Sequence, residues 1–244
     1  MSPPTGADTV IERAAELDGW MSDDQGHRLW AAAAACPTGG RIVEIGSFRG
    51  KSTVVLAAAA PAAVEVVAID PHAGNDRGPQ EIEGFADEAA ADHEIFLANL
   101  RAFGVAERVR HVRAHSGSAH PEVRGPIDVL YVDGAHRYGP ARADLRDWGA
   151  RVADGGTLLV HDAFSSIGVT LAILREITFT GRFRYVGRTR SLLELRAEPD
   201  TPRRGHVVRV LLQLPWFARN VGLKVALTLG LGRLLGDRAP DWPY

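Results

Sequence analysis

The sequence predicts a doubly wound, Rossmann-like α/β fold: a seven-stranded, mostly parallel sheet with one antiparallel strand and helices on both faces. Three observations support this prediction. Short apolar runs alternate with amphipathic helical segments between residues 40 and 197. Polar residues follow these runs where each predicted strand ends. Two closely spaced apolar runs, 183–186 and 192–195, predict a final hairpin, which adds the antiparallel strand.

Length and composition are those of one large globular domain with an appendage. The chain has 244 residues, of which 45% are hydrophobic and 24% charged, and its net charge is −2. This balance gives no overall attraction to nucleic acid or anionic lipid, so we expect neither as a partner. Cys36 is the only cysteine, which excludes an internal disulfide and favours a reducing, cytoplasmic location. We find no signal peptide and no apolar stretch of about 18 residues.

Three regions are expected: N-terminal helices in 1–39, the main domain in 40–197, and an apolar, basic extension in 198–244. The last 44 residues hold seven Lys or Arg against two Asp. This extension could pack on its own domain, form a subunit interface, or lie on a membrane surface. We favour a homodimer interface and do not expect membrane contact. Its glycines are expected to interrupt any long helix; they are Gly222, Gly230, Gly232 and Gly236.

The first half of the main domain contains two strand–helix units. Residues 7–35 predict two helices, and Arg41–Ile45 the first strand. A helix runs from Lys51 to about residue 60, and residues 64–70 form the second strand. The acidic, glycine-containing stretch 72–94 predicts a mobile flap. A helix follows, with one apolar face and a terminating glycine: Phe96, Leu100, Phe103 and Gly104.

The second half continues the alternation. Strands are predicted at 108–114, near a sheet edge, at 127–132, and at 157–160 after a turn at 154–156. The helix between the last two has Pro140 in its first turn and one apolar face, formed by Ala141, Leu145, Trp148 and Val152. A further helix begins near Ser166, and we expect its packed face to hold Ile167, Leu171 and Leu174.

The loop between the first strand and its helix has three interpretations. Gly50-Lys51-Ser52 suggests a phosphate-binding P-loop, but three residues separate Gly46 from Gly50 where that motif needs four. A nicotinamide-dinucleotide loop would need glycines where Ser47 and Phe48 stand. The third interpretation is a Glu-x-Gly-x-x-x-Gly loop, Glu44 to Gly50, followed twenty residues later by an acid at the end of the second strand, Asp70.

This loop and its following acid resemble those of class I S-adenosylmethionine (SAM)-dependent methyltransferases. The resemblance implies that the loop passes under the methionine part of SAM and that Asp70 binds the ribose hydroxyls. Two carboxylate oxygens suit a vicinal diol. Ser116 matches the adenine-side position of the family, although a turn serine is an alternative. The implied cofactor-binding residues are Glu44, Gly46, Ser47, Gly50, Ser52, Asp70, Ser116 and Asp133.

Polar residues after the fourth and fifth strands resemble the metal-dependent O-methyltransferases of this class. That resemblance implies a divalent cation, expected to be Mg²⁺, held by Asp133, His161 and Asp162. The family usually has a carboxylate where His161 stands, so a different cation, or an indirect role for His161, is an alternative. Asp133 could also be an ordinary turn acid, and His161 a buried, hydrogen-bonded histidine.

His136 is the candidate general base, three residues past Asp133, where catechol-type relatives carry a catalytic lysine. Its ordinary pKa of about 6.5 suits proton acceptance near neutral pH. A loop histidine bonded to a neighbouring carboxylate is the alternative.

The predicted function is SAM-dependent O-methylation of a small-molecule hydroxyl, with a sugar favoured as the acceptor and with metal assistance. The whole chain is also similar to the mycobacterial O-methyltransferases of methylmannose polysaccharide, which implies a mannoside acceptor under the 72–94 flap. Two alternatives are a P-loop nucleotide hydrolase and a non-catalytic SAM-fold protein that acts through its C-terminal extension.

Overall fold

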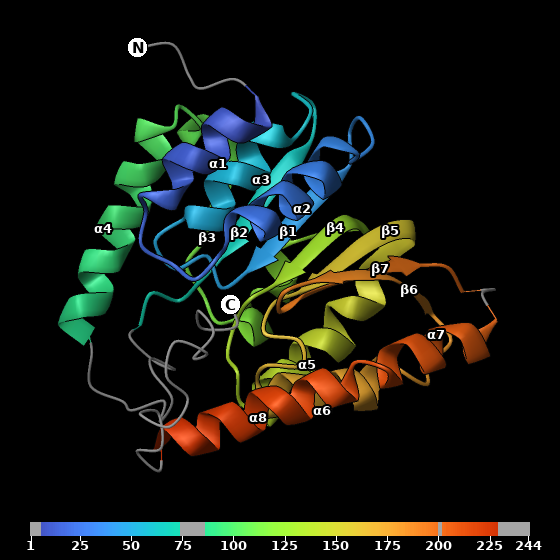
Figure 1. Ribbon diagram of the computed structural model, residues 1–244. Coiled ribbons are helices and arrows are strands. Elements are labelled where there is room, and N and C mark those ends of the chain that lie inside the picture. The colour runs from blue at the N-terminus through green and yellow to red at the C-terminus, as the bar shows by residue number, and fades with distance from the viewer. Residues whose placement is uncertain (1–5, 74–85, 200–201, 229–244) are drawn as a thin grey trace.

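A computed structural model describes residues 6–73, 86–199 and 202–228 of the chain. Its seven strands are β1 Arg41–Ile45, β2 Glu65–Ile69, β3 Val109–Val112, β4 Ile127–Val132, β5 Val152–Val160, β6 Phe183–Thr189 and β7 Leu192–Ala197. They form one sheet in the order β3-β2-β1-β4-β5-β7-β6 (Figure 1). Only β7 runs antiparallel to its neighbours, β5 and β6, so the predicted sheet is confirmed.

The helices divide between the two faces of the sheet (Figure 1). They are α1 Ala7–Ala15, α2 Asp23–Ala34, α3 Lys51–Ala59, α4 Ala86–Ala102, α5 Tyr138–Asp147, α6 Ile167–Glu176, α7 Arg203–Leu211 and α8 Leu214–Thr228. The first four cover one face, over a core that includes Leu56 and Phe96. The last four lie on the other, over a core that includes Trp148 and Phe164. Burying each such side chain contributes about 1.5–3 kcal/mol.

The acidic stretch 72–94 is partly helical, which corrects the prediction of a flap. Helix α4 already begins at Ala86, and its buried Phe96 and Leu100 anchor it on the sheet. Arg49 adds an ion pair with the buried carboxylate of Asp92, at 2.7 Å. The rest of the predicted flap, 74–85, lies outside the described residues.

The turn predicted at 154–156 is also wrong, because β5 runs through it from Val152. The pairing of β5 with β4 shifts between Ile127 and Val129, so extra residues of β5 bulge from the ladder. Gly155 takes a φ of 79° within this bulge, a conformation that glycine adopts without strain. The glycines therefore mark an irregularity in a strand rather than its start.

Helix α6 turns only part of the predicted face to the core, because Leu174 packs there but Ile167 and Leu171 do not. Ile167 and Leu171 are 57% and 46% exposed, while Ala172 and Ile173 are buried. Gly168 explains the rotation: a Cβ there would lie 2.2 Å from the carbonyl oxygen of His136. This backbone contact fixes the start of α6 and leaves Ile167 and Leu171 on its outer face.

The described part of the C-terminal extension packs on its own domain. Val210 is fully buried, and Trp216 and Phe217 pack against the core. Helix α8 continues through Gly222, so the predicted break there is wrong. A helical glycine costs only about 1 kcal/mol relative to alanine, which packing offsets. The other three glycines predicted to break the helix lie beyond the described residues. No helix in the described ranges is both long and apolar enough to cross a membrane.

Candidate active site

The site lies where the strand order reverses, between β1 and β4. The chain leaves β1 toward β2 on one side, while β4 connects to β5 on the other. Ligands of doubly wound sheets bind at the carboxyl ends of strands at such a point. The two loops touch here: the Asp133 N–H donates to the Ile45 carbonyl at 2.8 Å. Gly46, with φ 88°, permits the contact, because a Cβ would lie 2.1 Å from the Asp133 carbonyl oxygen.

Glu44 is fully buried below this loop and fastens it to α3. The hydroxyls of Ser52 and Thr53 donate to its two carboxylate oxygens. Burial raises the pKa of Glu44 and the two hydrogen bonds lower it, with a net value of about 8. Burial therefore favours the protonated form of this carboxyl. Glu44 and Ser52 support the loop from within the domain, and their contact with a cofactor stays a prediction.

Asp70 fastens the loop after β1 to the loop after β2. Its Oδ2 accepts the Phe48 N–H and its Oδ1 the His72 N–H, both at 2.8 Å. Phe48 and His72 have φ values of 45° and 44°, a left-handed conformation that costs about 1–3 kcal/mol each. Each carboxylate oxygen of Asp70 can still accept another hydrogen bond, as a ribose diol would require.

The remaining predicted cofactor residues lie at the same edge or close to it. Ser47 is buried, and its hydroxyl has no partner among the described residues. Gly50 adopts a φ of 86° immediately before α3. Ser116 begins a short 3₁₀ turn after β3 and hydrogen-bonds Asp144; burial outweighs that bond and raises the pKa of Asp144 to about 6.

Lys51, which suggested a P-loop, is engaged elsewhere. Its Nζ lies 3.3 Å from the Gly19 carbonyl oxygen, in the segment between α1 and α2. The lysine of a P-loop instead reaches the nucleotide phosphates. The side chain therefore binds the N-terminal helices, and the structure does not favour the nucleotide-binding alternative.

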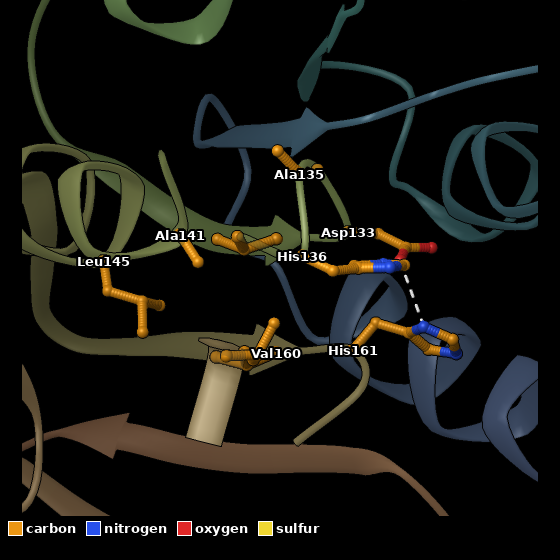
Figure 2. Close-up of a pocket in the computed structure, with 10 residues that line it drawn as sticks. Asp133, Ala135, His136, Ala141, Leu145, Val160 and His161 are labelled. Carbon is orange, nitrogen blue, oxygen red and sulfur yellow. Dashed lines mark ion pairs between the residues drawn. The ribbon is translucent and has the colours of Figure 1, made fainter. Parts of the chain in front are cut away.

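The ends of β4 and β5 bring the predicted reaction residues together (Figure 2). His161 Nδ1 lies 3.0 Å from Asp133 Oδ1, and His136 Nε2 lies 3.0 Å from Asp162 Oδ2. The two pairs adjoin, since His161 Nδ1 is 3.9 Å from Asp162 Oδ1. The His136 side chain is 49% exposed, whereas that of His161 is 3% exposed. Only the first histidine is therefore open to a ligand.

The carboxylates shift the pKa values of both histidines upward. For His136, burial lowers the pKa, but the hydrogen bond and charge of Asp162 raise it above the ordinary value. For His161, burial also lowers the pKa, but the charge of Asp133 outweighs burial and raises the pKa to about 9. The pKa of Asp162 falls well below its usual range, because the hydrogen bond from His136 and the His161 charge outweigh its burial.

Several side chains that support this cluster were not predicted. The Tyr131 hydroxyl donates to Asp133 Oδ2 at 2.9 Å, and Ser165 Oγ donates to Asp162 Oδ1 at 2.8 Å. Asn220 and Lys224 of α8 contact the loop after Asp162. In the sequence, Tyr131 cannot be told from an ordinary apolar strand residue. No sequence pattern in the extension indicates that α8 contacts residues some 60 positions earlier.

The predicted metal ligands do not fit a divalent cation as they are arranged. Mg²⁺ prefers six oxygen ligands around one point. Here Asp133 Oδ1 and Asp162 Oδ2 each face an imidazole, and Asp162 Oδ1 accepts from Ser165. Among the described residues, no three His, Cys, Asp or Glu side chains stand in a metal-binding arrangement. We therefore derive no chemical step through a metal.

Comparisons with known proteins agree with this geometry. Residues 43–163 match the model of a methyltransferase domain family. The fold is similar to cofactor-bound Rv0187 from MTB, at 21% identity and a TM-score of 0.55, covering 80% of this chain and 88% of that one. It is also similar to the SAM-bound O-methyltransferase TomG from Streptomyces achromogenes, at 19% identity and 0.53, covering 80% and 91%. The O-methyltransferase NovP gives 17% identity and 0.61, covering 80% and 92%. Residues 43–163 therefore match a methyltransferase domain, and the chain shares its fold with known O-methyltransferases.

Proposed function

We propose that this protein transfers the methyl group of SAM to a hydroxyl oxygen of a small molecule. The observation that carries the proposal is the pair formed by His136 and Asp162, 3.0 Å apart, at the sheet edge that also holds Gly46 and Asp70. This pair supports the proposal that His136 is the base, because Asp162 can hold its imidazole at the edge that carries the predicted cofactor loop. The comparison proteins TomG and NovP are themselves described as O-methyltransferases.

The proposed mechanism is an in-line displacement assisted by a general base. With its Nε2–H directed at Asp162, His136 can accept the acceptor's hydroxyl proton on Nδ1. The oxygen attacks the methyl carbon as the carbon–sulfur bond breaks, and the sulfonium becomes the neutral thioether of S-adenosylhomocysteine. Asp162 stabilises the imidazolium that forms. Such a base typically contributes about 10²–10⁴-fold to the rate.

The finer parts of the proposal are the acceptor, the assembly and the domain limits. A sugar hydroxyl, most simply a mannoside, is proposed from the sequence resemblance. A homodimer through 198–244 is supported by exposed apolar side chains, namely Val208 on α7, Leu212 between α7 and α8, and Val225 on α8. The proposed domain limits are N-terminal helices in 1–39 and the main domain in 40–197, before the extension.

Ser47, Gly50 and Ser116 are proposed to contact SAM.

A screen of hydroxylated acceptors with SAM labelled in its methyl group tests the function. We expect label to appear on oxygen in a sugar, phenol or polyketide acceptor, identified by mass spectrometry and NMR. A calorimetric titration with ATP serves as the control. Binding of ATP without binding of SAM would contradict the proposal, and SAM binding without any transfer would favour a non-catalytic role.

The divalent cation is tested separately. Because the carboxylates already face imidazoles and the mechanism needs no cation, we expect equal turnover in EDTA and in Mg²⁺. The contrary result would be a more than tenfold loss of turnover in EDTA that Mg²⁺ restores. If Asp133→Asn showed no such loss, the carboxylates would be shown to rearrange around a metal.

A further inference from the structure

We propose that helix α8 positions the loop that carries Asp162, through Asn220 and Lys224, and thereby orients the base His136. This inference rests on the proposed function for its catalytic part. The loop, residues 162–166, follows β5 and precedes α6. Neither α8 residue is placed among the reacting groups, so both are positioning residues.

The loop has a conformation that needs outside support. Asp162 and Phe164 have φ values of 53° and 61°, in the left-handed region that is unfavourable for residues with a side chain. Such a conformation is strained and persists only when its surroundings determine it. The N–H groups of Ser165 and Ser166 turn inward to the Asp162 carbonyl, at 3.1 and 3.0 Å.

Helix α8 supplies that support from the outer side of the loop. Asn220 Nδ2 donates to the Phe164 carbonyl at 3.1 Å, and Lys224 Nζ donates to the Ser165 carbonyl at 2.8 Å. The two donors are four residues apart and so share one face of the helix. Asn220 is fully buried, and Lys224 is partly buried. Figure 1 shows α8 on the same side of the sheet as α5 and α6.

The rest of α8 is anchored independently of the loop. Trp216 packs against the core beneath the sheet, and the Arg188 guanidinium lies 3.8 Å above its ring centre. A cation over the face of an indole is attracted by the ring, so this contact stabilises the start of the helix. The helix therefore provides a fixed frame against which Asn220 and Lys224 hold the two carbonyl groups.

The loop transmits this position to the base. Ser165 Oγ donates to Asp162 Oδ1 at 2.8 Å, while Asp162 Oδ2 lies 3.0 Å from His136 Nε2. Releasing the Ser165 carbonyl from Lys224 allows Ser165 and the carboxylate to move together. A displacement of about 1 Å in reacting geometry can lower a rate about 10²-fold.

The test is Lys224→Met in the full chain, which keeps the length of the side chain and removes its donor. We expect kcat to fall about tenfold with an unchanged KM for SAM, and the amides of Ser165 and Ser166 to exchange hydrogen faster. Lys224→Arg, which keeps a donor, should restore both. Arg219→Met, at an exposed position of the same helix, is the matched control.

The outcomes separate this inference from the proposed function. Unchanged hydrogen exchange in Lys224→Met would overturn the inference, as would faster exchange with unchanged kcat. If the wild-type protein transfers no methyl group to any acceptor, the proposed function fails. The hydrogen exchange of Ser165 and Ser166 then still tests, without any activity measurement, whether α8 positions the loop.

Discussion

The two halves of the site are built in different ways. The cofactor half, the loops after β1 and β2, uses backbone groups: Gly46 permits a close approach, and Asp70 collects the N–H groups of Phe48 and His72. The reaction half, at the ends of β4 and β5, uses paired side chains, including His136 and Asp162. Under the proposed function, SAM binding would depend on the shape of these loops, while methyl transfer would depend on the orientation of a few charged groups.

The largest effect is expected from a substitution that disrupts the reaction half alone. His136→Ala should lower kcat about 10²–10⁴-fold, because the base is lost. The dissociation constant for SAM should stay within about twofold of the wild-type value. Stopped-time assays with labelled SAM and calorimetry measure the two quantities, and His115→Ala, at an exposed histidine, is the control. Full activity in His136→Ala would remove this residue as the base.

The next largest effect is expected from a substitution that disrupts the cofactor half. Asp70→Ala should weaken SAM binding about 10–100-fold, because a charged acceptor of hydrogen bonds is worth about 1.5–3 kcal/mol. The rate at saturating SAM should change far less. Asp154→Ala, at an exposed acid of β5, is the control, and thermal unfolding checks that the loops stay folded. Unchanged SAM affinity would show that Asp70 serves only the loops.

The smallest effect is a pH shift within the reaction half. His136 must be neutral to accept a proton, and its pKa is raised by Asp162, so kcat should rise with pH through an inflection above 6.5. Asp162→Asn removes the charge that raises the pKa. The inflection should then move to lower pH, while the maximal rate falls. An inflection at the same pH in both proteins would show that the titration of His136 does not set the pH dependence of kcat.

Much of the fold was predictable because periodicity and glycine spacing are local signals. Strands β1 and β4 have the predicted bounds, and β3 lies at the sheet edge. The failures have tertiary causes. The rotation of α6 depends on a backbone contact of Gly168 with His136, and β5 continues through glycines that lie in a bulge.

The candidate site divides in the same way. The sequence predicts that the strand-end residues meet, and Asp133, His136, His161 and Asp162 do come together. The sequence leaves open whether the histidines pair with these carboxylates, and the structure shows both pairs. The sequence does not indicate Lys224, because the contact with Ser165 is set by the docking of α8 rather than by any local pattern.

The central claim is that the two halves act independently on binding and on chemistry. A double-mutant cycle on kcat/KM for SAM tests it most directly, with wild type, Asp70→Ala, His136→Ala and the double variant. Effects of separate sites add as free energies, so the double variant should lose the product of the two single-variant factors, within about twofold. A double variant no slower than His136→Ala alone would show that Asp70 acts through the same group as the base, and would contradict the division.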